Sequence, residues 1–281
     1  MARLTGATPI SRTAFVSTYV PRRCGIATFT YDLATTVGER EIVALHPASE
    51  PGPYGVPHLP LVAAESIKPR VGLQGRSVIL SFGLLGPGKG CETVIEAMPA
   101  VAMAVPSACY VILGATHPDV LARDGESYRA GLEAQVAALG MADHVKFVDR
   151  FVGRVELGTW LEAADIIATP YPDLDRSVSG TLAYAMGAGR AIVSTPFAYA
   201  TELLADGRGR LVAPGSPAAF AEAFTELLRN TELRTSLGRR AYEHSRGMVW
   251  WEVGSQYRRI FDRVSRAASA RSTRRYEAVV A

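Results

Sequence analysis

The sequence predicts an α/β fold in which a parallel, doubly wound sheet is flanked by helices. Two observations lead to this prediction. From residue 77 onward, short apolar runs alternate with longer amphipathic segments, and a glycine-rich loop joins the first run to the segment after it. Apolar runs are typical of parallel strands buried on both faces, and amphipathic segments between them form crossover helices. A short unit of strand, helix and strand precedes this region.

That first unit occupies residues 1–46. Residues 14–16 and 42–45 are apolar runs, and between them Phe29, Leu33 and Val37 recur at helical spacing within residues 27–37. Residues 47–76 contain six prolines. Because proline lacks an N–H and disrupts helices and central strands, this stretch is predicted to be an extended linker.

Strands and helices alternate through residues 77–266, which are predicted to form one domain. Strands are predicted at residues 78–82, 110–113, 145–148, 166–168, 191–193 and 211–212. Helices are predicted at residues 92–101, 126–139, 156–163, 180–187, 201–204, 217–228, 231–244 and 250–264. The last of these carries aromatic and aliphatic residues on one face and is expected to return toward the N-terminal unit. Residues 267–281 are small and basic and are predicted to be disordered.

Composition argues against several classes of protein. The net charge of +3 over 281 residues gives no argument for a nucleic-acid partner. No apolar run reaches the ~20 residues of a membrane helix, and the N-terminus lacks the apolar core of a secretion signal, so we expect a cytoplasmic protein without a membrane span. Cys24, Cys91 and Cys109 match no zinc or redox spacing, so free thiols and no metal site are expected.

The Gly-Lys loop, residues 83–90, reads GLLGPGKG and joins a buried strand to a helix. Ligands of an open parallel sheet bind beyond the carboxyl ends of its strands, which is where this loop lies. Gly83, Gly88 and Gly90 let the backbone approach a phosphate, and Lys89 adds positive charge. A tight turn with a solvated lysine is the simpler alternative. A P-loop-like NTPase is a weaker one, because Gly90 stands where the Mg²⁺-ligating Ser or Thr is required.

The serine loop, residues 177–181, provides a second place for an anion. Ser179 or Ser177 can cap the following helix, Gly180 permits close approach, and the amides around Thr181 are free to bind phosphate oxygens. Helix capping alone is the alternative. Since both loops follow strands of one parallel sheet, they are expected at one edge, which suits a nucleotide diphosphate.

From Val78 to Val253 the chain resembles family 4 of the retaining glycosyltransferases, which have the GT-B fold. The resemblance rests on Ser81-Phe82-Gly83 with Lys89-Gly90, on residues 179–193 (SGTLAYAMGAGRAIV), and on Glu202, Gly207 and Leu211-Val212. Residues 19–27, which include Gly25, resemble the glycine loop that opens the family's first domain. The larger domain would then be the Rossmann-like C-terminal half of a GT-B fold.

The resemblance implies transfer of a sugar from a UDP-, GDP- or ADP-sugar to an unidentified acceptor, with retention of configuration and no bound cofactor. It implies contacts to the donor diphosphate from Gly83, Gly88, Lys89, Gly90, Ser179, Gly180 and Thr181. Candidates for contacts to the donor base or sugar are Phe151, Val152, Tyr184, Glu202, Gly25 and His117. The alternatives are structural roles: Phe151 packs in the core, Glu202 places a charge near a helix start, and His117 caps a turn.

The sequence also departs from the family. Leu84 stands where an Arg is usual, and Arg176 and Tyr184 stand at the positions of a common pair of glutamates. We expect most of the N-terminal acceptor domain to be missing, leaving a βαβ remnant, and no histidine matches the family's catalytic-site motif, so no catalytic residue is assigned.

Two hypotheses therefore stay open: a glycosyltransferase, or a non-catalytic sugar-nucleotide-binding module. The exposed N-terminal unit is expected to pack on the last helix or to form a homodimer.

Overall fold

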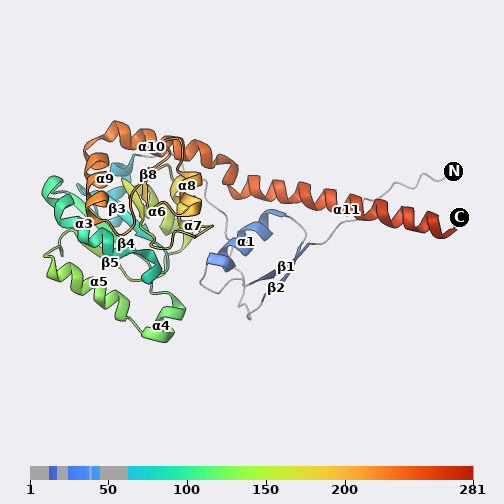
Figure 1. The fold of residues 1–281 in the computed structure, drawn as a ribbon, viewed down its shortest axis with the longest axis horizontal. Coiled ribbons are helices and arrows are strands. Elements are labelled where there is room, and N and C mark those ends of the chain that lie inside the picture. Colours follow the sequence, from blue (N-terminus) through green and yellow to red (C-terminus); the bar gives the residue numbers. More distant parts are fainter. Residues whose placement is uncertain (1–12, 18–24, 38–39, 45–62, 281) are drawn as a thin grey trace. The chain divides into compact units, whose positions relative to one another are not determined.

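The computed structural model describes residues 13–17, 25–37, 40–44 and 63–280 (Figure 1). The chain divides into two compact units. The larger is the continuous stretch Pro57–Arg246, and the smaller combines the residues up to Val56 with Gly247–Ala281. The last helix therefore belongs to the smaller unit.

The larger unit is built on a six-stranded parallel sheet with the order β5-β4-β3-β6-β7-β8. The strands are β3 (Ser77–Phe82), β4 (Ala108–Leu113), β5 (Val145–Val148), β6 (Ile166–Thr169), β7 (Ala191–Ser194) and β8 (Arg210–Leu211). Each lies within two residues of its predicted start, because each apolar run is long enough for one buried strand. The predicted fold class is confirmed.

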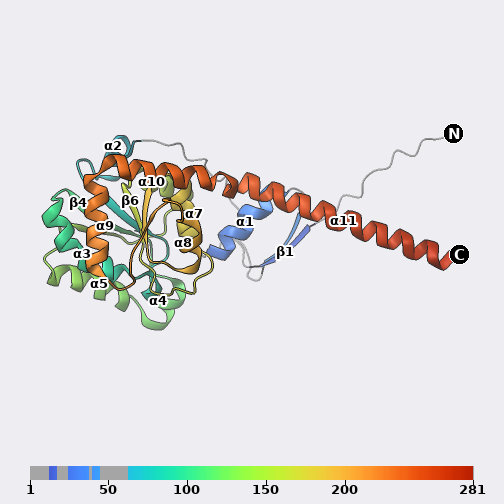
Figure 2. The ribbon, with the colours of Figure 1, turned by 45° about the horizontal axis from the view of Figure 1, so that its top comes forward.

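Helices cover both faces of this sheet. Helices α3 (Cys91–Ala104), α5 (Ser127–Ala138) and α9 (Pro217–Arg229) form one apolar cluster with strand residues such as Ile79 and Tyr110. The alternate strand residues Leu80 and Val111 are also fully buried and point to the opposite face. There α7 (Gly180–Gly187) contacts β6 and β7. Figure 2 shows β6 between α9 and α7.

The remaining helices of the larger unit are α2 (Ala64–Ile67), α4 (Pro118–Asp124), α6 (Arg154–Ala163), α8 (Ala198–Leu203) and α10 (Thr231–His244), with short 3₁₀ turns at Lys68–Val71, Pro87–Lys89 and Ser245–Met248. Sequence patterns missed α4, which begins at Pro118 and is capped by His117. Proline is well suited to a first helical turn, where its missing N–H needs no partner.

The prediction of an extended linker over residues 47–76 was wrong for its last part. Helix α2 and the 3₁₀ turn Lys68–Val71 lie there. The cause is a tertiary contact: Lys68 is 1% exposed, and its Nζ lies 2.8 Å from Asp165 Oδ2. The same carboxylate accepts a hydrogen bond from the Val78 amide at 2.7 Å. Residues 47–62 and the loop 18–24 lie outside the described residues.

In the smaller unit, β1 (Thr13–Ser17) pairs in parallel with β2 (Arg40–Ala44), and α1 (Gly25–Val37) connects them. Helix α1 contacts α11 (Trp250–Val280), as expected for packing on the last helix. The approach is close enough that a Cβ on Gly254 would overlap Thr36 Oγ1.

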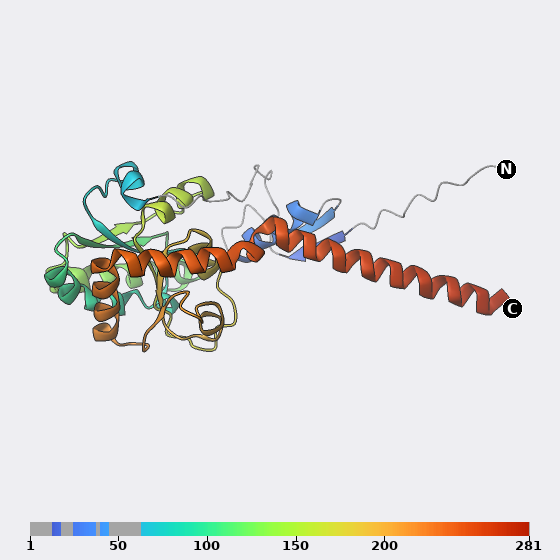
Figure 3. The same cartoon turned by 90° about the horizontal axis from the view of Figure 1, so that it is seen from above.

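The predicted disorder from residue 267 was also wrong. Helix α11 runs without interruption to Val280 (Figure 3). The reason is local: after Gly254 this stretch contains no glycine or proline and is rich in Ala and Arg, which favour helix. Among the described residues, no helix has the length and apolarity needed to cross a membrane.

Candidate functional site

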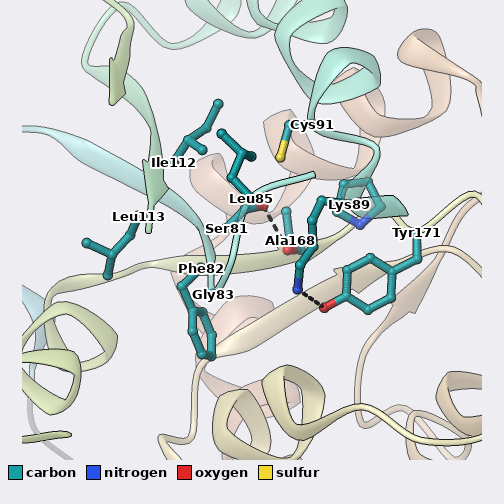
Figure 4. A pocket seen from close by; sticks show the side chains of 11 residues that line it. Ser81, Phe82, Gly83, Leu85, Lys89, Cys91, Ile112, Leu113, Ala168 and Tyr171 are labelled. Carbon is teal, nitrogen blue, oxygen red and sulfur yellow. Dashed lines mark hydrogen bonds between the residues drawn. The ribbon is translucent and has the colours of Figure 1, made fainter. Parts of the chain in front are cut away.

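The site lies where the strand order reverses. From β3 the chain moves outward to β4 and β5, then crosses back so that β6 lies on the other side of β3. Connections leave in opposite directions from such a point, and a crevice opens beyond the strand ends. A pocket occupies this place (Figure 4). Its lining comes from the ends of β3, β4 and β6, from the Gly-Lys loop and from the start of α3: Ser81, Phe82, Gly83, Leu85, Lys89, Cys91, Ile112, Leu113, Ala168, Pro170 and Tyr171.

Glycines allow backbone segments to approach closely at the base of this pocket. Gly83 has a φ of +106° and Gly90 a φ of +65°, both in the region that favours glycine. A Cβ on Gly90 would overlap the carbonyl oxygen of Pro170, beyond the end of β6. A Cβ on Gly114, beyond β4, would lie 2.8 Å from the carbonyl carbon of Gly83. The Gly-Lys loop therefore touches the ends of both neighbouring strands.

Lys89 projects into the pocket toward Tyr171 (Figure 4). Its Nζ donates a hydrogen bond to the Tyr171 hydroxyl at 3.4 Å and lies 5.0 Å from the centre of the ring. A Cβ placed on Gly83 would be 3.4 Å from Lys89 Nζ and 3.7 Å from Thr181 Oγ1. The ammonium group and the threonine hydroxyl thus lie beside the same glycine, so the structure brings the two predicted anion sites together.

The serine loop caps helix α7 as predicted. Ser179 Oγ accepts a hydrogen bond from the Leu182 amide at 3.1 Å, and Ser179 is buried. The first amides of a helix have no intrahelical partner and carry the positive end of its dipole. The amides of Gly180 and Thr181 are in this first turn, beside Lys89, where an anion would be stabilised.

Tyr171 connects these groups and was not found from the sequence. It is 2% exposed. Burial alone would raise the pKa of Tyr171, but the charge of Lys89 and hydrogen bonds with Thr181, Ser179 and Lys89 outweigh it, so the pKa is lowered. An electrostatic field that favours the tyrosinate form of Tyr171 also favours a negatively charged phosphate oxygen beside that hydroxyl. The signal in the sequence was an aromatic residue directly beyond a strand end.

Arg176 is the second residue that sequence reasoning did not assign to the site, although it noted the departure there. Its guanidinium carbon lies 4.6 Å from the centre of the Tyr171 ring. Its Nη2 is 3.8 Å from the position a Cβ would take on Gly88. The side chain therefore reaches from the β6–α7 connection to the Gly-Lys loop.

Cys91 also lines the pocket. It is free and buried, as is Cys109. Burial raises the pKa of Cys91 to about 11, so its thiol stays protonated near neutral pH and is a poor nucleophile. Among the described residues, no group of His, Cys, Asp and Glu could hold a metal ion.

None of the candidates for base and sugar contacts is among the residues that line this pocket. Phe151 is 45% exposed and Val152 half-buried, on the connection between β5 and α6. His117 caps α4, accepting a hydrogen bond at Nδ1 from the Asp119 amide at 3.2 Å. Its backbone N–H also bonds to Leu85 O at 2.8 Å, which places it beside the Gly-Lys loop.

Three further candidates are spread over other elements. Tyr184 lies in α7, Glu202 is exposed in α8, and Gly25 begins α1 in the smaller unit. Their contacts to a donor, like those of Phe151, Val152 and His117, stay predictions.

Comparison with known proteins identifies the family. Residues 76–230, more than half of the chain and all six strands of the large sheet, match the family model described as Glycosyl transferases group 1. The chain belongs to this family.

The curated relatives that this chain matches are longer than the chain. It is 28% identical over 199 residues to the phosphatidyl-myo-inositol mannosyltransferase of Mycobacterium leprae, covering 69% of this chain and 48% of that protein. The D-inositol 3-phosphate glycosyltransferase of Jonesia denitrificans is 25% identical, with 68% of this chain and 44% of that protein covered. The chain spans about half the length of the curated relatives it matches.

Solved structures share the fold. The C-terminal domain of the group 1 glycosyltransferase LpcC from Francisella tularensis has a TM-score of 0.59 at 22% identity, covering 66% of this chain and 93% of that domain. Anabaena Alr3699/HepE in complex with UDP has a TM-score of 0.60 at 20% identity, and the match covers 74% of this chain and 52% of that chain. Sucrose-phosphate synthase from Thermosynechococcus elongatus reaches 0.64 at 19% identity, covering 90% and 59%. These likenesses confirm the Rossmann-like architecture of a GT-B glycosyltransferase.

Proposed function

We propose that this chain binds the diphosphate of a nucleotide-sugar donor in the pocket beyond β3 and β6, and transfers the sugar to an acceptor with retention of configuration, as in family 4. One observation carries the proposal: Lys89 and the first turn of α7 meet beside Gly83. This places a full positive charge and free helix amides around one point, an arrangement suited to two linked phosphates.

The same groups account for the chemistry expected at the donor. When the bond between the sugar and the diphosphate breaks, negative charge develops on the departing phosphate oxygen. Lys89 and the dipole of α7 are fixed before the reaction and stabilise that charge as it forms. Removing one such fixed donor typically costs about 10²–10³-fold in rate.

The comparisons suggest which donors and acceptors to test. The structures of the Anabaena protein are complexes with UDP and with UDP-glucose. The names of the relatives specify mannosyl transfer to phosphatidyl-myo-inositol and transfer to D-inositol 3-phosphate. UDP-, GDP- and ADP-sugars are therefore the donors to test, with inositol-containing acceptors first.

A non-catalytic sugar-nucleotide-binding module is the second candidate. Transfer requires donor and acceptor to be held in register, and the pocket described here supplies only the donor side. The NTPase hypothesis gains no support, because a Cβ at position 90 would overlap Pro170 and a Mg²⁺-binding Ser or Thr has no room there.

Thermal unfolding with UDP, GDP and ADP tests the binding proposal. A ligand at 100 times its Kd stabilises the folded state by about 2.7 kcal/mol, so one of the three should raise the Tm measurably. Lys89→Ala should weaken that ligand by about tenfold or more, because a hydrogen bond to a charged group is worth about 1.5–3 kcal/mol. Lys146→Ala, at an exposed lysine on β5, is the matched control.

The absence of any Tm shift with all three nucleotides would refute the binding proposal. If binding is present, donor hydrolysis or transfer by the purified chain separates the two candidates. Turnover that is lost in Lys89→Ala supports the glycosyltransferase, whereas tight binding without turnover supports the module.

A further inference from the structure

We propose that Arg176 is the second cationic contact for the donor diphosphate, held by the ring of Tyr171 and acting together with Lys89. The inference rests on the proposed donor-binding function and assigns a specific residue within it. It also explains how a loop with a single cation could hold two phosphates.

The argument begins with the position of the two cations. Lys89 Nζ lies 5.0 Å from the centre of the Tyr171 ring, and the guanidinium carbon of Arg176 lies 4.6 Å from the same centre. They come from different connections, one beyond β3 and the other beyond β6. A single buried aromatic ring therefore brings together two cations that are 87 residues apart in the chain.

The second step concerns what these cations lack. Within the part of the chain that the structure describes, neither Lys89 nor Arg176 has a carboxylate within 4.0 Å, and the buried Nε of Arg176 has no hydrogen-bond partner. Two like charges beside one ring repel each other, and a buried N–H without an acceptor is costly. A doubly charged ligand between them would relieve both penalties.

The third step is preorganisation. The Arg176 carbonyl accepts a hydrogen bond from the Tyr199 amide at 3.3 Å, and the Leu174 carbonyl accepts one from Ala198 at 2.9 Å. These bonds fix the connection to the first turn of α8. The Tyr171 ring packs against Phe197, with 5.2 Å between ring centres. The backbone that carries Arg176 is thus anchored, and its guanidinium already lies over the Tyr171 ring, so little freedom is lost when an anion binds.

The fourth step is the division of labour between the two side chains. Lysine is a compact point charge, whereas arginine offers a planar fork that can bind two phosphate oxygens at once. The Gly-Lys loop contributes only Lys89, because its other residues are Gly, Leu and Pro. Arg176 Nη2 lies near Gly88, so the second cation approaches the same loop from outside it.

The test compares ligands that differ only in phosphate. Affinities of the nucleoside, its monophosphate and its diphosphate are measured by titration calorimetry, using whichever of uridine, guanosine or adenosine derivatives the wild-type chain binds. Arg176→Gln should weaken the diphosphate by about tenfold or more and the nucleoside by less than about twofold, since only the phosphate contact is removed. Arg176→Lys should retain part of the affinity.

Arg239→Gln is the matched control, because it removes one positive charge from an exposed site on α10. It should leave all three affinities unchanged. Equal weakening of nucleoside and diphosphate by Arg176→Gln would overturn the inference, since that result means that Arg176 only supports the fold. The inference would also be overturned if Arg176→Gln left the diphosphate affinity unchanged while Lys89→Ala still lowered it. Failure of the wild-type chain to bind any diphosphate would instead remove the proposed function and this inference with it.

Discussion

Replacing Gly90 by alanine tests the geometry on which the site depends. Gly90 has a φ of +65°, and an added Cβ would overlap the carbonyl oxygen of Pro170 and lie 3.1 Å from its carbonyl carbon. The contacted atoms belong to the backbone of Pro170, directly beyond β6, so they cannot move aside as the end of a flexible side chain would. Either the Gly-Lys loop or the end of β6 has to move.

Two terms set the expected loss in the free energy of unfolding. An alanine in the left-handed region costs about 1–2 kcal/mol. Overpacking against a well-packed neighbour costs about 1–3 kcal/mol more. The total for Gly90→Ala is therefore about 2–5 kcal/mol. Because the adjacent Lys89 moves with the loop, the affinity for a nucleotide diphosphate should fall as well.

Gly140→Ala measures the first term alone, so the difference between the two variants gives the second. Gly140 has a φ of +66°, nearly the same as Gly90, but nothing lies within 4 Å of an added Cβ. Urea unfolding followed by circular dichroism should show a loss of about 1–2 kcal/mol for Gly140→Ala and a clearly larger one for Gly90→Ala. Equal losses in the two variants would refute the close contact with Pro170, and with it the described path of the Gly-Lys loop.

Two further predictions address the serine loop and Tyr171. Ser179→Ala removes a helix cap and should cost about 0.5–2 kcal/mol in urea unfolding while also weakening the diphosphate; Ser216→Ala, which removes the cap of α9, should cost as much without changing affinity. Equal effects of both variants on affinity would contradict the assignment. The lowered pKa of Tyr171 means that its ionisation stabilises the fold fully above the ordinary pKa of 10.0 and that this contribution is lost as pH falls through the folded pKa. The ultraviolet titration of the wild-type chain should therefore contain an ionisation below pH 10.0 that is absent in Tyr171→Phe. The stability of the wild-type chain relative to that variant should rise toward pH 10.0. Identical titrations would contradict the environment described for Tyr171.

The sheet and most helices could be predicted from local patterns. Helix α7 was predicted at its observed bounds, because Ser179 is a strong cap for its first turn. Strands β3 and β4 were recognisable as short, mostly apolar runs. These elements depend on residues close together in the sequence, so the sequence alone contains the necessary information.

Other features depend on contacts between distant segments. Helix α2 follows from the burial of Lys68 on Asp165, and no local pattern near a proline-rich stretch indicates that pairing. The two anion loops and Lys89 were predictable from glycine, serine and lysine. Tyr171 and Arg176 were not, because a tyrosine beyond a strand is usually part of the core. Only the approach of Lys89, Ser179, Thr181 and Arg176 to one ring gives it a role.

The division of the chain also affects how it folds during synthesis. The larger unit, Pro57–Arg246, is one continuous stretch, whereas α1 packs against α11, which follows the larger unit in the chain. Domains generally fold as units, in order of their appearance from the ribosome. The sheet of the larger unit can therefore close before α11 is synthesised, while α1, although synthesised before the larger unit, has to wait for α11. A ribosome stalled after Arg246 should hold a folded larger unit attached to an N-terminal segment whose helix still lacks its partner.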